Sequence, residues 1–412
     1  MFKFDAEKYS PVLGAVGHVL TWYNFALFMP FLHIISKSFF PLENEIYREV
    51  LSFLALSVGL FIRPLGAAIF GPIGDKFGRQ KAISLSILLM AVPTLCIGLL
   101  PDYNQIGIWA PILLVLCRAL QGVSMGGEYT AAMVHLVEKA PVHRRGFYGS
   151  WSDAGSQVGV LMGCGALVWL DSCFSQEEVY SFAWRIPFLC AVVLIPFAFF
   201  TPNKQETKKK KEKESLVKML LDHKKEVGCT ISVTAFSAVA FYTLLTFFPY
   251  FLVSKEILTL REATLCSTWA NITIIFVILG AGYLSDYFSR KPFLIIGIVG
   301  VTIAAYVMFL LQIKDFCYWM ALHVAYGFFI SVYYSCRAAF FAEAFPAKVR
   351  CTAVSLSLSI AQAIFGGLTP VVMSYLTSCS LKIVSVIPIT FVAIIAIYAL
   401  TLLKDRTGEK LV

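Results

Sequence analysis

Residues 71–81 read GPIGDKFGRQK, a glycine-bearing segment with one acid and three bases that follows a long apolar run. A related segment, GYLSDYFSRK at residues 282–291, follows a second apolar run. Its acid, Asp286, comes 211 residues after Asp75. A segment that returns after half the length of a chain is the mark of an internal repeat.

A second pair of segments repeats in the same order. Residues 138–141 read EKAP and residues 343–346 read EAFP, at a spacing of 205. Because both pairs recur in register, we predict that the chain consists of two homologous halves.

The composition places these segments between membrane-spanning helices. Hydrophobic residues make up 58% of the chain and charged residues 14%, with a mean hydropathy of +0.76, whereas a soluble domain carries about 25% charged residues. The apolar residues come in runs of about 20, the length of helix that crosses about 30 Å of hydrocarbon. We therefore predict an all-α membrane protein with twelve transmembrane helices, at about residues 11–32, 50–73, 82–100, 107–137, 147–170, 182–201, 227–253, 263–285, 292–312, 316–344, 351–376 and 382–403.

A hydrophilic segment divides these spans into two sets of six. Residues 203–226 contain the run Lys208–Lys211, which is typical of a solvated linker rather than of a binding site. We predict two pseudo-symmetric six-helix bundles, at residues 1–202 and 227–412, joined by a cytoplasmic basic linker at 203–226.

The distribution of basic residues predicts the orientation. With the N-terminus inside, 24 of the 34 Lys and Arg residues fall in cytoplasmic segments, 6 in external loops and 4 within spans. This asymmetry favours both termini in the cytoplasm. The net charge of +9 has the same origin, so it does not indicate a nucleic-acid partner.

The two repeated hairpin segments predict a gate. Their acids and bases can form salt bridges to neighbouring helix ends, and such bridges must break when two halves of a protein move apart. The alternative is that the bases only fix the topology, but two copies at matched positions favour the first interpretation. We assign four residues to a conditional cytoplasmic gate: Asp75, Arg79, Asp286 and Arg290.

Four further segments read FIRPLG at 61–66, QGVSMGGEY at 121–129, RGFYGSW at 145–151 and WRIPF at 184–188. They resemble segments of the metabolite:proton symporter family of the major facilitator superfamily. Members of that family take up proline, betaines, shikimate and tricarboxylic or keto acids into bacteria, and the resemblance is strongest to the proline and glycine betaine symporters. It covers almost the whole chain and implies the twelve-helix fold of the superfamily and a bacterial inner membrane. It also implies a small-molecule solute, protons as the coupling ion, no cofactor and a monomer.

One departure from the family affects the first span. Where the osmolyte symporters carry Glu-Trp-Phe-Asp-Phe, this chain has Thr21-Trp22-Tyr23-Asn24-Phe25. Both acids are replaced by neutral residues, so proton coupling must use another group. We keep Trp22, Tyr23 and Asn24 as candidate contacts of the solute.

Acids within spans are candidates for that other group, because ionisable side chains in hydrocarbon are costly. Glu128 lies ten residues before Glu138, about 15 Å inside the cytoplasmic end of its helix, where a partly dehydrated carboxyl can take up and release a proton. The alternative is a permanent ion pair with Arg63 or Arg118. Asp153 is a second candidate, nearer the cytoplasm.

Two arginines and an aromatic residue complete the predicted interior. Arg118 shares one helical stripe with Tyr129, and either can contact the solute. Arg337 precedes Glu343 by six residues, about 9 Å from the cytoplasmic end of its helix. It can serve structure alone, bind a substrate carboxylate, or pair with Glu128 across a central cavity.

Together these patterns predict a secondary active importer that works by proton symport and alternating access. The expected solute is a zwitterionic osmolyte or amino acid first, and an organic acid such as a di- or tricarboxylate second. A transport-inactive membrane sensor is the alternative from another class. We do not expect an enzyme, since no nucleophile–base pairing, metal-ligand set or nucleotide loop is found outside the spans.

Overall fold

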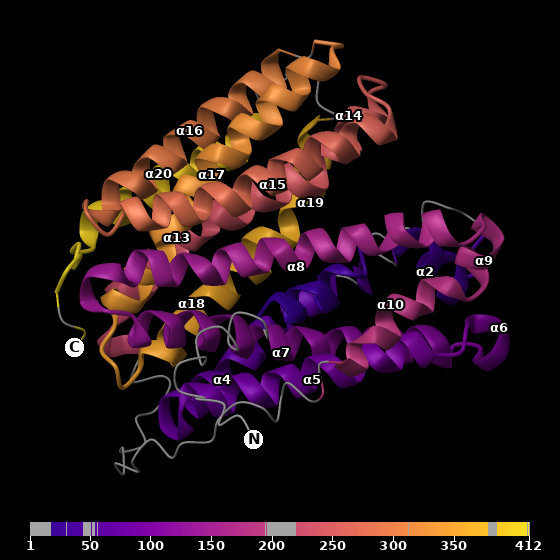
Figure 1. Cartoon of the computed structure of the whole chain (residues 1–412), viewed down its shortest axis with the longest axis horizontal. Coiled ribbons are helices and arrows are strands. Elements are labelled where there is room, and N and C mark those ends of the chain that lie inside the picture. The colour runs from indigo at the N-terminus through magenta and orange to yellow at the C-terminus, as the bar shows by residue number, and fades with distance from the viewer. Residues whose placement is uncertain are drawn as a thin grey trace, which may run out of the picture. The chain divides into compact units, whose positions relative to one another are not determined.

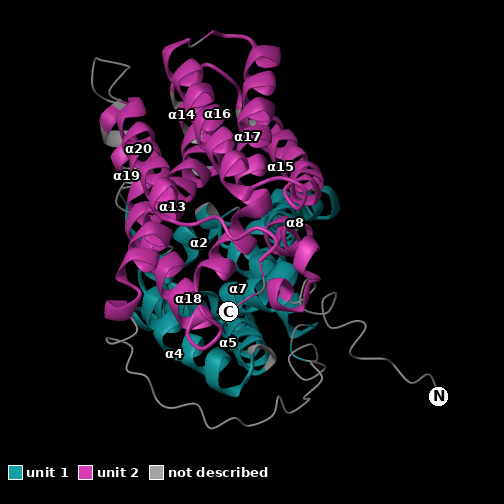
Figure 2. Cartoon of the chain, turned by 90° about the vertical axis from the view of Figure 1, so that its left-hand side faces the viewer, with its two compact units in different colours: residues 1–135, 155–211 teal, residues 136–154, 212–412 magenta. Residues whose placement is uncertain are grey.

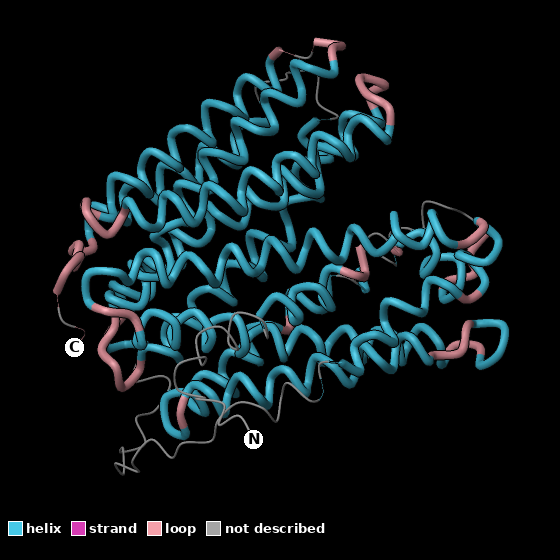
Figure 3. The backbone as a smooth tube through the Cα atoms, in the orientation of Figure 1, coloured by secondary structure: helices cyan, strands magenta, loops and turns pink. Residues whose placement is uncertain are grey.

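The computed structural model describes residues 18–29, 31–43, 51, 54, 55, 57–193, 195, 220–311, 313–377, 385–409 and 411. These residues form helices and loops, with no strand among them (Figure 3). Nine of the described helices are long and apolar enough to cross a membrane. The predicted linker at 203–226 lies outside the described residues up to residue 219.

The chain forms two compact units, which Figure 2 colours separately. Unit 1 comprises Met1–His135 and Gly155–Lys211, and unit 2 comprises Leu136–Ala154 and Glu212–Val412. Residues 136–154 therefore pack with the C-terminal half, although they precede the predicted linker. The division into bundles at 1–202 and 227–412 stays a prediction.

Unit 1 contains a helix at residues 18–26 and, within the long span Ser57–Phe77, the helix α4 (Figure 1). Its elements are α2 (Leu32–Phe39), α4 (Arg63–Phe77), α5 (Arg79–Leu99), α6 (Tyr103–Ile106), α7 (Trp109–Lys139, up to His135), α8 (Arg145–Cys173, from Gly155), α9 (Gln176–Ser181), η2 (Ala183–Arg185), α10 (Ile186–Leu189) and η3 (Cys190–Val193).

Aromatic side chains contribute to a buried hydrophobic core of unit 1. The ring of Phe188 packs edge to face on Phe31 at 5.9 Å and on Trp184 at 5.8 Å between ring centroids. Trp184 also meets Phe39 at 6.2 Å. Each such pair contributes about 0.5–1.5 kcal/mol beyond the area it buries, so the WRIPF segment has a structural role.

Unit 2 contains the remaining helices: the end of α7, η1 (Val142–Arg144), the start of α8, α13 (Lys224–Tyr242), η4 (Thr243–Phe247), α14 (Phe248–Ser254), α15 (Leu260–Leu284), α16 (Arg290–Leu310), α17 (Phe316–Ala344), α18 (Arg350–Ala361), η5 (Gln362–Gly366), α19 (Gly367–Thr377) and α20 (Ile387–Leu402). Helix α17 packs against α15 and α16, and α13 packs against α18 and α20.

Both η4 and η5 are π-helical turns inserted between α-helical segments. A π turn widens a helix locally and is frequent at functional sites.

The outer surfaces of α15 and α20 expose large apolar side chains, with Phe276 72% and Ile394 64% exposed. These surfaces suit a lipid environment, as the hydropathy predicts.

Candidate functional site

Close packing between two helices determines the surroundings of Glu128, the acid predicted from the sequence. On α7, a Cβ at Gly122 would overlap the backbone of Gly59, and one at Gly126 would overlap the backbone of Arg63. The two helices therefore touch backbone to backbone, which small residues permit within membranes. The glycines Gly122 and Gly126 of the QGVSMGGEY segment have this packing role, and Glu128, two residues after Gly126, is fully buried.

Glu128 forms a buried cluster with a histidine from the first helix. Nδ1 of His18 lies 3.1 Å from both carboxylate oxygens of Glu128, and Nε2 lies 2.7 Å from Oγ of Ser156 on α8. The side chains of His18 and Glu128 are 0% exposed. Among the described residues, His18 is the hydrogen-bond partner of Glu128, and the alternative pairing of this acid with Arg63 or Arg118 stays a prediction.

Aromatic rings cover the His18–Glu128–Ser156 cluster. The ring of Tyr129 lies 5.2 Å from that of His18 and 6.1 Å from that of Trp22. Tyr129 is 7% exposed. Trp22 and Tyr129, two of the predicted solute contacts, therefore lie together beside the buried acid.

The other predicted solute contacts of unit 1 bond to or pack against neighbouring groups of the protein. Tyr23 donates a hydrogen bond of 3.2 Å to the carbonyl of Pro187, and Asn24 donates one of 2.7 Å to the carbonyl of Leu20 in its own helix. The guanidinium of Arg118 lies over the rings of Phe25 and Phe28 at 4.9 and 4.4 Å, and it donates to Gln121 at 2.6 Å.

Unit 2 holds a second buried ionic cluster. Nη2 of Arg337 on α17 donates to Oδ1 of Asp153 on α8 at 2.5 Å, and both side chains are about 95% buried, at 4% and 5% exposure. Nη1 of Arg337 lies 3.3 Å from Oγ of Ser237 on α13, and its guanidinium lies 4.5 Å from the ring centroid of Tyr334. The structure thus gives Arg337 and Glu128 different partners, and the pairing of these two with each other stays a prediction.

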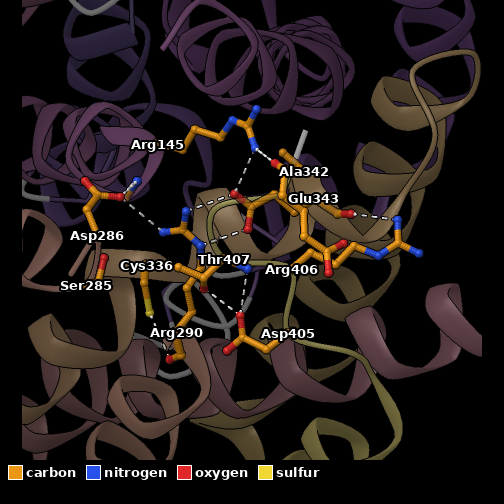
Figure 4. A network of polar contacts seen from close by, with 12 residues as sticks. Arg145, Ser285, Asp286, Arg290, Cys336, Ala342, Glu343, Asp405, Arg406 and Thr407 are labelled. Carbon is orange, nitrogen blue, oxygen red and sulfur yellow. Dashed lines mark hydrogen bonds and ion pairs between the residues drawn. The ribbon is translucent and has the colours of Figure 1, made fainter. Parts of the chain in front are cut away.

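The second gate segment forms a polar network, shown in Figure 4. Arg290 makes a two-pronged ion pair with Glu343, at 2.8 and 2.9 Å, and lies 3.6 Å from Asp286. Asp286 accepts hydrogen bonds from the amides of Gly146 and Phe147, at 2.6 and 2.9 Å. A carboxylate at a helix N-terminus accepts hydrogen bonds from the free amides and interacts favourably with the positive end of the helix dipole. Asp286 therefore stabilises the start of α8.

The first gate segment has fewer described contacts. Asp75 is half-buried in the last turn of α4, and Arg79 begins α5, with its side chain outside the described part of the chain. The role of all four predicted gate residues stays a prediction.

Two arginines at repeat-equivalent positions pair with the glutamates of the opposite repeat. Arg145 and Arg350 are 205 residues apart, the same spacing as Glu138 and Glu343. Arg145 lies 3.5 Å from Glu343, while Arg350 donates to Glu138 at 2.7 Å. Unit 2 therefore contains a reciprocal exchange of partners between the two halves of the repeat.

The segment after α20 covers this network. Arg145 donates to the carbonyl of Glu409 at 2.6 Å, and Asp405 accepts from the hydroxyl of Ser289 at 2.6 Å and the amide of Lys291 at 3.0 Å. Burial by itself would raise the pKa of Asp405, but hydrogen bonds from Ser289, Thr407 and Lys291 lower that pKa below its usual value.

The sequence reasoning overlooked several of these residues. His18 is an ionisable side chain within a span, so the criterion that selected Glu128 could have selected it. The sequence analysis used Glu343 only as a repeat position and Arg145 only as part of a family segment. The spacing between Arg145 and Arg350 equals that between Glu138 and Glu343, and this equality is the signal that could have identified the pairs. No group of three metal-binding side chains occurs in the described part of the chain.

Known proteins match the chain along its length. Residues 12–227 match the family described as Sugar (and other) transporter, and residues 230–411 match the Major Facilitator Superfamily. The glycine betaine/proline/ectoine/pipecolic acid transporter OusA of Dickeya dadantii is 32% identical over 96% of this chain and 83% of its own. The proline/betaine transporter of Escherichia coli K12 is 31% identical over 94% of this chain and 81% of its own.

Solved structures share the fold. The proton:xylose symporter XylE, bound to 6-bromo-6-deoxy-D-glucose, superposes with a TM-score of 0.80 at 17% identity, covering 100% of this chain and 98% of that one. The inward-open xylose transporter XylE from E. coli gives 0.67 at 16% identity, covering 97% of each chain. The predicted twelve-helix fold and the family resemblance are both confirmed. The chain therefore belongs to the major facilitator superfamily, in the same family of membrane transporters as the proteins named proline/betaine transporters.

Proposed function

We propose that the chain is a secondary active importer of small zwitterionic solutes, such as proline or a betaine, driven by symport of protons with alternating access. Membership of a transporter family supports the transport class, which is not an enzyme class. The names of the relatives support the solute class. The observation that carries proton coupling is the His18–Glu128–Ser156 cluster.

This cluster can exist in two charge states without moving its heavy atoms. When the imidazole is protonated, Nδ1 donates to Glu128 and Nε2 donates to Ser156, at the 3.1 and 2.7 Å separations observed. When it is neutral, Nδ1–H still donates to the carboxylate, and Nε2 accepts from the Ser156 hydroxyl, which only rotates. The cluster therefore takes up one proton as its net charge changes from −1 to 0.

The position of the cluster explains how the chain can couple protons although its first helix lacks the acids of the osmolyte symporters. His18 lies one helical turn before Thr21, which stands where the osmolyte symporters carry a glutamate. The first helix thus still provides a titratable group, now a base that shares its proton with Glu128 on α7. Such intramembrane groups are costly and mark proton pathways.

The proposed setting is the bacterial inner membrane, with both termini in the cytoplasm and the protein acting as a monomer without a cofactor. The excess of Lys and Arg in one set of loops supports this orientation. Protease treatment of terminal tags in intact cells tests it, because cytoplasmic termini would be protected, whereas termini outside the cell would be cleaved.

Reconstitution into proteoliposomes tests the function. Under an imposed proton gradient, the wild type should accumulate labelled L-proline or glycine betaine and acidify the lumen. Glu128→Gln should abolish accumulation yet retain counterflow exchange, because the solute can still cross without a proton. Glu178→Gln is the matched control, since that carboxylate is exposed and caps the short helix α9.

Each other outcome is decisive. Accumulation by Glu128→Gln would remove the proton role from this cluster. Downhill flux alone in the wild type would make the protein a uniporter or exchanger. Uptake of a di- or tricarboxylate in place of zwitterions would establish the organic-acid alternative.

A further inference from the structure

The geometry points to the Arg337–Asp153 pair as the recognition site for the two charges of a zwitterion, an inference that rests on the proposed function. The carboxylate of the solute would take the place of Asp153 at Arg337, and its cationic nitrogen would take the place of Arg337 at Asp153. The pair is buried in unit 2, where its two charges face each other at 2.5 Å.

The exchange is selective because of charge balance. A buried ion that loses its partner is strongly destabilising. An anion bound to Arg337 would take that arginine away from Asp153, and a cation bound to Asp153 would take that carboxylate away from Arg337. A zwitterion replaces both partners at once and leaves neither charge alone, so this pair favours zwitterions over singly charged solutes.

The surroundings of Arg337 offer further polar and aromatic groups. Ser237 lies within 3.3 Å of Nη1, and the ring of Tyr334 lies 4.5 Å from the guanidinium. An aromatic face that holds a guanidinium can also hold a substituted ammonium by cation–π attraction. The side chains therefore provide a second contact for the cationic end of the solute.

Buried hydroxyl side chains extend this polar surface along α13. Thr230, Thr234 and Ser237 follow one helical face at spacings of four and three residues, and all three are 0% exposed. Within the described part of the chain, the hydroxyl oxygens of Thr230 and Thr234 have no hydrogen-bond partner. Buried polar groups are normally paired, so these hydroxyls are available to a polar ligand or its water.

Binding of a charge series to the purified full-length protein tests the site without a proton gradient. The series is L-proline, cationic L-prolinamide and anionic cyclopentanecarboxylate, which share a five-membered ring. The wild type should prefer L-proline by about 10- to 100-fold, the range expected from one or two charged hydrogen bonds.

Neutralising one partner should invert that preference. Asp153→Asn should bind cyclopentanecarboxylate about tenfold more tightly than the wild type does, and Arg337→Gln should gain similarly for L-prolinamide. The double variant Asp153→Asn/Arg337→Gln leaves no unpaired charge, so it should keep its melting temperature while losing the preference for L-proline. The matched control Glu138→Gln/Arg350→Gln removes another ion pair of unit 2 and should keep the wild-type order.

The inference is overturned if the single variants fold and keep the wild-type order of affinities. If the single variants do not fold, a double variant that still prefers L-proline overturns it. A wild type that binds none of the three compounds overturns the proposed function as well. A wild type that accumulates L-proline while the variants retain its selectivity overturns only the site.

Discussion

Arg350 donates a 2.7 Å hydrogen bond to Glu138, and these two residues come from opposite halves of the internal repeat. The same arginine donates to the carbonyls of Ala342 and Phe345, at 2.7 and 3.1 Å. Arg350 is 1% exposed, so its charge depends on these partners. The contact joins the end of α7 to the start of α18 within unit 2.

A double-mutant cycle on this pair should therefore show coupling. Arg350→Gln should destabilise more than Glu138→Gln, because it also leaves two carbonyls without a donor. The coupling energy should be about 0.5–3 kcal/mol, measured by denaturation in detergent micelles. Strictly additive effects would show that the pair contributes nothing as a pair.

Asp286→Asn should loosen the start of α8. The two carboxylate oxygens accept from the amides of Gly146 and Phe147, whereas Asn keeps one acceptor oxygen and loses the charge at the helix N-terminus, which costs about 0.3–1 kcal/mol. We expect a changed rate of cysteine labelling from the external side, in a background without the native cysteines. Asp75→Asn should also change this rate if the two segments act together, and Asp286→Glu keeps the charge as a control. Unaltered labelling in both asparagine variants would leave these acids as topology signals.

Gly122→Ala should destabilise unit 1. Its Cβ would overlap the backbone of Gly59, so the two helices must separate. A Cβ added at Gly165 on α8 would meet no atom within 4 Å, and Gly165→Ala should be neutral or stabilising by up to about 1 kcal/mol. Melting temperatures of both variants in detergent provide the test. Equal melting temperatures would mean that the close approach is dispensable.

Asp405 should make the C-terminal segment sensitive to acid. Because the pKa of this carboxyl is lowered in the folded protein, its stabilising effect is present above the ordinary aspartate value of about 3.9. It is lost as the pH falls through the lower folded value. Asp405→Asn should remove this dependence at a cost on the order of 1 kcal/mol, allowing for solvent screening of a half-buried group. Proteolysis of the C-terminal segment across pH 3–7 (an acid-stable protease below about pH 5) measures it, and identical profiles for variant and wild type would contradict the assignment.

The sequence by itself determined the class of the protein. Apolar runs long enough to cross a bilayer, the recurrence of Asp75 as Asp286, and the segments such as QGVSMGGEY depend only on local composition and spacing. These properties do not depend on how the helices rotate about their axes. For the same reason they identified Glu128, Asp153 and Arg337 as costly buried charges without identifying the partner of each.

The tertiary structure decided those partners. Glu128 pairs with His18, 110 residues away, and Asp153 pairs with Arg337, 184 residues away. No sequence pattern predicts either pairing, because the rotation and close approach of the helices determine which side chains face each other. Glycine contacts such as Gly122 on Gly59 set that approach, and a rotation of one residue, about 100° on a helix, would turn each charge toward a different neighbour.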